Sequence, residues 1–251
     1  MKPHIHICAD AEAIAREAAI EFARIAREAV IQHGFFTVAL AGGSTPRRLY
    51  ELIAERAQGR AGVPWESVHF FFGDERPVPP DHVDSNFNLA NQALFSRIPV
   101  PAANLHRIHG EMPDLEVAAQ LYETDLRGFF LARLALRGTL PRFDLVLLGM
   151  GADGHTASLF PGGNAVWEQQ RWCVSGWVEK LHQHRVTLTP PVLNAADNVL
   201  FLVAGEEKAE SLEEVILGEN DPGRLPAQIV RPKEGRIAWL IDESAARRLA
   251  R

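Results

Sequence analysis

A histidine and an aspartate stand two positions apart in the stretch GMGADGHTASLFP, residues 149–161, directly after the apolar run FDLVLL. An imidazole with an ordinary pKa of about 6.5 is suited to general-base work near neutral pH. Asp153 is close enough in sequence to orient His155, and the glycines would let backbone N–H groups approach a substrate oxygen. Ser158 lacks the GxSxG context of a nucleophile elbow. The pattern is compatible with catalysis by His155 and with a structural histidine, and it leaves both open.

A second glycine-containing stretch, AGGSTPRRLYELI at 41–53, follows another apolar run, FFTVALA. Gly42 and Gly43 allow a tight turn, and Ser44 or Thr45 could cap a helix that begins there. Backbone N–H groups at such a helix start are suited to binding phosphate. The alternative is an ordinary turn between a strand and a helix.

Basic residues follow two of the apolar runs. Arg47 and Arg48 lie in the first turns of the expected helix, where the helix dipole favours negative charge, and a bound phosphate would offset this. Lys208 begins a helical pattern after NVLFLVAG, in a polar loop of its own, and could bind an anion there. For all three, the alternative is a solvated side chain.

The loop FGDERPVPPDHVDSNFNLA, residues 72–90, follows a further apolar run. Asp74, Glu75 and Arg76 stand together at its start, and a guanidinium there could bind a phosphate or carboxylate oxygen pair. The alternative is a surface ion pair. Asn86 is expected to cap the next helix, and a role as ligand donor is the second possibility.

Apolar runs and amphipathic helical patterns alternate along the chain, which predicts a parallel, doubly wound α/β sheet in one domain, 1–251. Ligands bind beyond the carboxyl ends of such strands. The four loops described above, at 41–53, 72–90, 149–161 and, with Lys208, 204–216, should therefore meet there. Asp10 and Gly34 predict the ends of the first helix. Strands are expected at 4–8, 35–41, 68–73, 143–149, 198–205 and 236–241, and helices at 11–33, 45–57, 86–97, 114–137 and 206–217.

The formal charge of −6 argues against a nucleic-acid partner, although a local site can still hold a small anion. No apolar stretch approaches the roughly 20 residues of a membrane span, and no secretory signal is apparent. Two cysteines, Cys8 and Cys173, lie in apolar stretches and are expected to be buried, reduced thiols. These features favour a cytoplasmic protein without membrane contact.

Ten histidines raise the question of a metal site. His4 and His6 are spaced to share a strand face, and so are His182 and His184. Neither pair has a third ligand at a recognisable spacing, so no metal is expected.

Taken together, the four loops resemble the 6-phosphogluconolactonase family. The similarity extends in family order over essentially the whole chain, and it is carried by LAGGSTPRRLYELI, FFGDERPVPPDHVDSNFNLA, FDLVLLGMGADGHTASLFPG and RVTLTPPVLNAADNVLFLVAGEEKA. The resemblance implies a three-layer αβα domain with a Rossmann-like, mostly parallel sheet, and a monomer.

The resemblance also implies hydrolysis of 6-phosphoglucono-1,5-lactone, a step of the oxidative pentose phosphate pathway, without a metal or organic cofactor. His155 would activate water for attack on the lactone carbonyl, and Asp153 would orient it. The glycine-rich turn would hold the 6-phosphate together with basic partners. The candidate substrate-binding residues are Gly42, Gly43, Ser44, Thr45, Asp74, Arg76, Lys208 and, in HRVTLT, Arg185.

Two rival functions share parts of this pattern. Sugar-phosphate deaminase-isomerases also carry the DGH triplet, but they have a glutamate five residues after the histidine, where this chain has Phe160. They also tend to have an aromatic residue where this chain has Arg76. A non-enzymatic sugar-phosphate sensor would need a further module, for which no segment is left over, and would have no need for His155.

Overall fold

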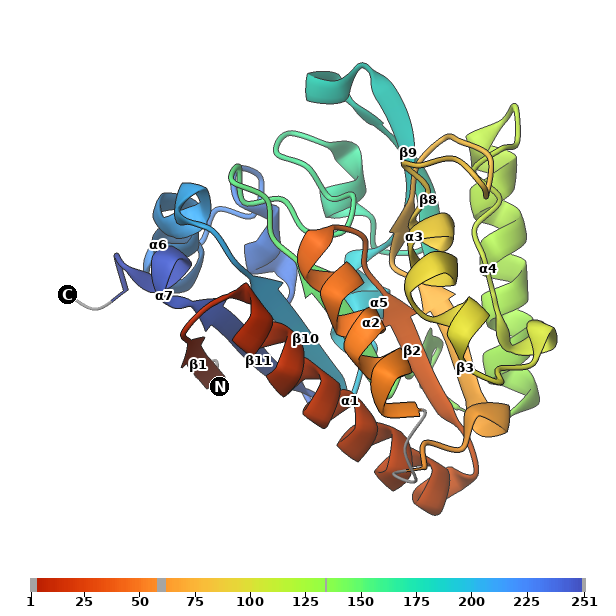
Figure 1. Cartoon of the computed structure of the whole chain (residues 1–251). Coiled ribbons are helices and arrows are strands. Elements are labelled where there is room, and N and C mark those ends of the chain that lie inside the picture. The colour runs from red at the N-terminus through yellow and green to blue at the C-terminus, as the bar shows by residue number, and fades with distance from the viewer. Residues whose placement is uncertain (1–3, 58–61, 134, 250–251) are drawn as a thin grey trace.

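The computed structural model describes residues 4–57, 62–133 and 135–249, and its centre is a six-stranded sheet whose strands all run parallel (Figure 1). The central strands are continuous apolar runs buried on both faces, as parallel strands require. The parallel α/β fold expected from the sequence is confirmed. The strand order is β1 (His4–Cys8), β11 (Arg236–Asp242), β10 (Asn198–Val203), β7 (Leu145–Gly149), β2 (Phe36–Leu40) and β3 (Val68–Phe72).

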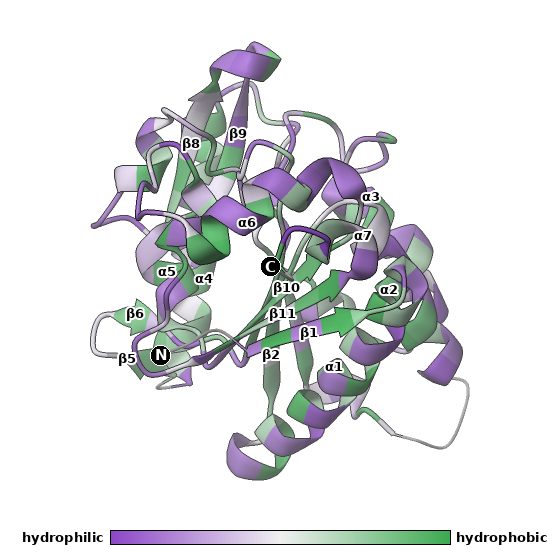
Figure 2. Ribbon diagram, turned by 90° about the vertical axis from the view of Figure 1, so that its left-hand side faces the viewer, coloured by the Kyte–Doolittle hydropathy of each residue, from purple (hydrophilic) through white to green (hydrophobic). Residues whose placement is uncertain are grey.

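Helices cover both faces of this sheet. Figure 2 shows α1 (Ala11–His33) and α2 (Ser44–Ala57) on one side, and α4 (Leu115–Ala132) and α5 (Pro190–Ala195) on the other. Because side chains alternate along β3, Phe70 packs against Phe22 of α1 while Phe71 packs against Phe129 of α4. The remaining helices are α3 (Asn86–Ala93), α6 (Ala209–Leu217) and α7 (Glu243–Ala246).

The sequence signals at the ends of the first helix are confirmed. Asp10 accepts a hydrogen bond from the backbone N–H of Ala13, and Gly34 ends the helix with φ of 88°. Three other helices are shorter than expected. The helix predicted over 206–217 begins at Ala209, after a 3-10 turn at Glu206–Lys208. The helix predicted over 114–137 ends at Ala132, and the chain then forms a small hairpin of β5 (Leu136–Arg137) and β6 (Leu140–Pro141). The helix predicted over 86–97 ends at Ala93, followed by a 3-10 turn.

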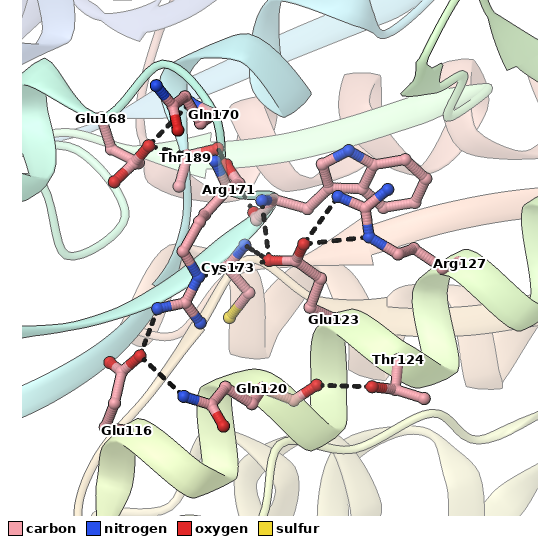
Figure 3. A network of polar contacts seen from close by, with 11 residues as sticks. Glu116, Gln120, Glu123, Thr124, Arg127, Glu168, Gln170, Arg171, Cys173 and Thr189 are labelled. Atoms are coloured by element: carbon pink, nitrogen blue, oxygen red, sulfur yellow. Dashed lines mark hydrogen bonds and ion pairs between the residues drawn. The ribbon is translucent and has the colours of Figure 1, made fainter.

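A second, antiparallel sheet was not expected from the sequence. It consists of β4 (Asp74–Glu75), β9 (Gln183–Leu188) and β8 (Cys173–Val178) in that order, so that β8 and β9 form a hairpin beside the loop after β3. Glu123 of α4 anchors the start of β8, since its carboxylate accepts the N–H groups of Trp172 and Cys173 at 2.9 and 3.2 Å (Figure 3). Figure 1 shows the hairpin extending beyond the carboxyl ends of the parallel strands, where the expected site residues lie.

The connections reverse direction between β2 and β7. The chain steps from β2 outward to β3, and later from β7 outward through β10 to β11 on the other side. The loops that follow β2 and β7 therefore diverge from a common point at the carboxyl edge, which is where open parallel sheets hold their ligands.

At the opposite, amino-terminal ends of the strands, a buried carboxylate joins the two central strands. Oδ2 of Asp144 accepts hydrogen bonds from N and Oγ1 of Thr37, both at 2.8 Å, and Nε2 of His33 lies 2.9 Å from Oδ1. The hydrogen bond to Asp144 raises the pKa of His33 above its ordinary value, against the opposing effect of burial. His33 thereby links the end of α1 to the sheet.

This contact predicts a pH-dependent contribution to stability. Because the folded state holds the His33 proton more tightly than the unfolded chain, the contact stabilises the fold below the unfolded pKa of about 6.5 and is lost as pH rises through the folded value. The difference in free energy of unfolding between wild type and His33→Gln should therefore be largest at about pH 5.5. The side chain is 36% exposed, which limits the effect to below about 1 kcal/mol. Urea denaturation across pH measures it, and a difference independent of pH would contradict the assignment.

Candidate active site

A cleft of about 390 Å³ opens at the carboxyl edge of the sheet, at the point where the strand order reverses. Its walls come from the loops after β2, β3 and β7, from the segment after β10 and from the β8–β9 hairpin. The candidate catalytic and substrate-binding residues named with the family resemblance all line it, so the expectation that these loops meet is confirmed. Those residues are Gly42, Gly43, Ser44, Thr45, Asp74, Arg76, Asp153, His155, Arg185 and Lys208.

The glycine-rich turn after β2 places the start of α2 against the cleft. Gly43 has φ of +107°, a backbone conformation that favours glycine, and a Cβ on Gly42 would lie 1.9 Å from Oδ1 of Asn86. The helix begins at Ser44 itself, so the expectation that Ser44 or Thr45 caps it from outside is wrong. The first N–H groups of a helix have no partner within it, so this turn presents donors at the cleft.

The two arginines in the first turns of α2, Arg47 and Arg48, do not line the cleft. Arg48 forms ion pairs with Glu12 of α1 at 2.7 Å and with Glu51 and Glu55 of its own helix. Arg47 donates a hydrogen bond to Gln92 of α3. Helix α2 packs beside α1 and α3, and those neighbours satisfy both guanidinium groups. Neither side chain can therefore contact an anion in the cleft, and the phosphate site expected at this turn stays a prediction for its backbone N–H groups.

The carboxylate of Glu75 serves the protein itself. It accepts the backbone N–H groups of Asn86 and Phe87 at 2.8 and 2.9 Å and the hydroxyl of Ser85 at 3.0 Å, and so stabilises the start of α3. Burial raises the pKa of Glu75, against the effect of these donors. The N-cap of α3 is Ser85, so the expected capping role of Asn86 is wrong.

Asp74 connects three loops at the floor of the cleft. One oxygen accepts the hydroxyl of Ser158 at 2.6 Å and the other accepts Nδ2 of Asn86 at 3.1 Å. Asn86 in turn lies against Gly42, so closely that a side chain of even one carbon on Gly42 would overlap its amide. Both oxygens of Asp74 are bound by protein groups. Asp74 therefore holds the loops around the cleft together, besides lining the cleft.

Three cations face the cleft without a carboxylate partner. Within the described ranges, no ion pair involves Arg76, Arg185 or Lys208. Arg76 donates to the carbonyl oxygen of Asp84, and Arg185, only 9% exposed, donates to that of His184 at 3.2 Å. Burial and then the neighbouring charge of Arg76 lower the pKa of Arg185. A bound anion would stabilise these positive charges.

His155 and Asp153 form a direct pair beside this positive group. Nδ1 of His155 lies 2.5 Å from Oδ1 of Asp153, and Nζ of Lys180 lies 3.0 Å from Oδ2. The hydrogen bond to His155, together with that to Lys180, holds the pKa of Asp153 well below its usual range. An ionised carboxylate only accepts hydrogen bonds, so Nδ1 carries a proton and Nε2 of the neutral ring keeps its lone pair. The imidazole can then act as a base through Nε2.

The surroundings of His155 differ in part from what the sequence suggested. The side chain is 30% exposed at the cleft and its ring stacks on Phe160, with centroids 4.2 Å apart. The N–H groups of Gly151 and Gly154 donate within the loop, to the carbonyl oxygens of His155 and Gly151, so the expectation that they reach a substrate is wrong for these two.

Sequence reasoning missed the roles of three other cleft residues: Lys180, Phe160 as the surface beneath the imidazole, and Ser158 as the partner of Asp74. Lys180 belongs to the hairpin that the sequence patterns did not reveal. His182, expected on a strand face with His184, lies in a left-handed turn outside β9. Among the described residues, no three His, Cys, Asp or Glu side chains are grouped as metal ligands.

The chain matches known proteins over nearly its whole length. The model of the family described as glucosamine-6-phosphate isomerases/6-phosphogluconolactonase matches residues 9–239. A 6-phosphogluconolactonase of Synechocystis sp. is 39% identical over 99% of both chains, and one of Nostoc sp. is 41% identical over 88% of both. The solved 6-phosphogluconolactonase from Trypanosoma brucei superimposes with a TM-score of 0.85 at 30% identity, over 99% of each chain.

The chain belongs to the glucosamine-6-phosphate isomerase/6-phosphogluconolactonase family. The resemblance seen in the sequence is confirmed, and so is the expected enzyme class, that of the carboxylic ester hydrolases.

Both cysteines are buried and free. In the part of the chain that the structure describes, every helix is too short or too polar to cross a membrane. The roles of individual cleft residues stay predictions.

The packing of Gly151 against the imidazole gives a test of the site's geometry. A methyl group at position 151 would lie 2.2 Å from Nδ1 and Cε1 of His155, so Gly151→Ala should displace the ring and break its hydrogen bond to Asp153. Gly149→Ala is the matched control, because a methyl group there meets no atom within 4 Å. Proton NMR of the imidazole N–H measures the contact. The signal should survive in Gly149→Ala and vanish in Gly151→Ala, and its survival in both would contradict this placement.

Proposed function

We propose that this protein hydrolyses 6-phosphoglucono-1,5-lactone to 6-phosphogluconate, as a single domain spanning 1–251 and in the oxidative pentose phosphate pathway. The observation that carries the proposal is the shared cleft: a His–Asp pair and three cations without carboxylate partners among the described residues line one cavity of sugar-phosphate size. The relatives named 6-phosphogluconolactonase support the same reaction.

The reaction needs one proton transfer in each direction. A water molecule attacks the lactone carbonyl carbon while Nε2 of His155 takes its proton, and Asp153 stabilises the imidazolium that forms. The tetrahedral intermediate then collapses, the bond between the carbonyl carbon and the ring oxygen breaks, and the imidazolium returns the proton to that oxygen. Atoms and charge balance without a redox partner or cofactor.

The phosphate end of the substrate is held by the positive side of the cleft. The donors at the start of α2, from Gly43 to Thr45, and the guanidinium groups of Arg76 and Arg185 converge there, with Lys208 contributing from the segment after β10. Such contacts position the lactone carbonyl for attack, and positioning of this kind supplies several kcal/mol, up to about 7–11, of a reaction barrier.

The alternative function, that of a sugar-phosphate deaminase-isomerase, would need a glutamate near the histidine, and this chain has none at that position. The residue five positions after His155 is Phe160, whose ring stacks on the imidazole, and only Asp74 and Asp153 supply carboxylates to the described cleft lining. Release of ammonia from glucosamine 6-phosphate would reverse this assignment.

The role of His155 is tested by following acid release from freshly made lactone, above its spontaneous hydrolysis. General-base catalysis contributes about 10²–10⁴-fold, so His155→Ala should lose at least about a hundredfold in kcat while still binding 6-phosphogluconate. His155→Gln is the sterically closer variant and should be equally slow. Equal rates for wild type and His155→Ala would refute the mechanism, and loss of product binding would point to a structural role instead.

The anion-binding role of Arg185 predicts a different kinetic signature. Removing one charged hydrogen-bonding partner of the phosphate costs about 1.5–3 kcal/mol, so Arg185→Met should raise KM roughly 10- to 150-fold with a smaller change in kcat. Arg47→Met is the matched control, since that guanidinium binds Gln92 outside the cleft. Steady-state kinetics of both variants decide between the assignments. An effect from Arg47→Met equal to that from Arg185→Met would contradict them.

A further inference from the structure

Lys180 lies beside the proposed base but comes from a different part of the fold. It belongs to the 3-10 turn Glu179–Leu181 at the tip of the β8–β9 hairpin, and it lines the cleft together with Leu181. Its ammonium group is 3.0 Å from Oδ2 of Asp153, whose other oxygen bonds to His155. One carboxylate therefore bridges an imidazole and an ammonium group.

The hairpin tip is braced by contacts of its own. Nε1 of Trp177 donates to Glu179 at 2.7 Å, and the Trp177 ring contacts that of His184 on the facing strand, with centroids 5.2 Å apart. His182 reverses the chain in a left-handed conformation with φ of 47°. These contacts fix the turn that carries Lys180, so the ammonium group reaches Asp153 from a structured support.

The other charges in the cleft have separate functions in the proposed reaction. Arg76, Arg185 and Lys208 line the cleft as the proposed partners of the phosphate, and Asp74 is bound by Ser158 and Asn86. Asp153 is the carboxylate in contact with His155, and Lys180 contacts the other oxygen of that carboxylate. Substrate phosphate neutralises the first three cations when it binds, whereas Lys180 keeps its carboxylate partner throughout.

We propose that Lys180 is a positioning residue of the reaction: it holds the Asp153 carboxylate against His155, and its charge disfavours the protonated imidazole. The inference rests on the proposed hydrolysis, in which His155 must be unprotonated to accept a proton from water.

The test is the pH dependence of kcat at low ionic strength. Without the ammonium group, the protonated imidazole is favoured, so the acid limb for Lys180→Met should move to higher pH. An exposed ion pair is worth about 0.2–1 kcal/mol, which corresponds to a shift of roughly 0.2–0.7 pH units and up to about a fivefold loss of kcat on the limb. KM should stay within about twofold.

Two variants control for charge and for folding. Lys180→Arg keeps the positive charge and should retain the wild-type limb. Lys233→Met removes an exposed lysine outside the cleft and should change nothing. The salt dependence of the wild-type pH profile tests the same point without relying on the folding of a variant. At about 1 M salt the screening length falls to about 3 Å, so the acid limb of the wild type should move towards that of Lys180→Met.

The outcomes separate this inference from the proposed function. An unchanged limb in Lys180→Met, or a shifted limb that Lys180→Arg does not restore, overturns the positioning role. A raised KM with an unchanged limb also overturns it, because the ammonium group would then bind substrate. Hydrolysis by the wild type no faster than the spontaneous rate would overturn the proposed function itself, and the inference with it.

Discussion

The geometry of the cleft depends on two buried carboxylates that follow β3. Glu75 binds the first N–H groups of α3, and Asp74 binds Ser158 from the loop after β7 and Asn86, which packs against Gly42. A buried carboxylate is costly unless its oxygens are hydrogen-bonded, so these partners cannot move apart without a large penalty. The loops after β2, β3 and β7 are thereby locked together, and the sheet edge presents one fixed cavity.

Charge pairing divides the basic residues near the cleft into two groups. Arg48 is surrounded by Glu12, Glu51 and Glu55, and its side chain faces away from the cavity. Arg76 and Arg185 instead donate to backbone carbonyl groups and face each other's charge. Among the described residues these two guanidinium groups have no carboxylate partner, which supports their proposed role as partners of the substrate phosphate.

Local sequence patterns predicted the features that depend on neighbouring residues. Asp10 and Gly34 mark the ends of α1, and the apolar runs mark the parallel strands, because capping and burial on both faces are encoded within a few residues. The convergence of the loops followed from a general rule of parallel sheets. The direction of Arg48 could not be predicted, since it is set by Glu12, 36 positions away on another helix.

The β8–β9 hairpin escaped prediction for a related reason. Its strands mix polar and apolar residues, as in CVSGWV and QHRVTL, and its position is set by pairing with the two-residue strand β4 and by Glu123 of α4. Lys180 therefore has no local signal, since its contact with Asp153 spans 27 positions. Arg185 was a candidate only through the family resemblance.

The hairpin also imposes a direction on the cleft. At its root, β9 pairs with β4, where Thr187 stands opposite Asp74, and Arg185 lies close to this root. At its tip, Lys180 contacts Asp153 beside His155. A single extended element thus presents one cation to the anion-binding side and another to the base. Under the proposed roles, the substrate must lie along β9 with its phosphate towards the root and its lactone towards the tip, because the reverse orientation would place the carbonyl out of reach of His155.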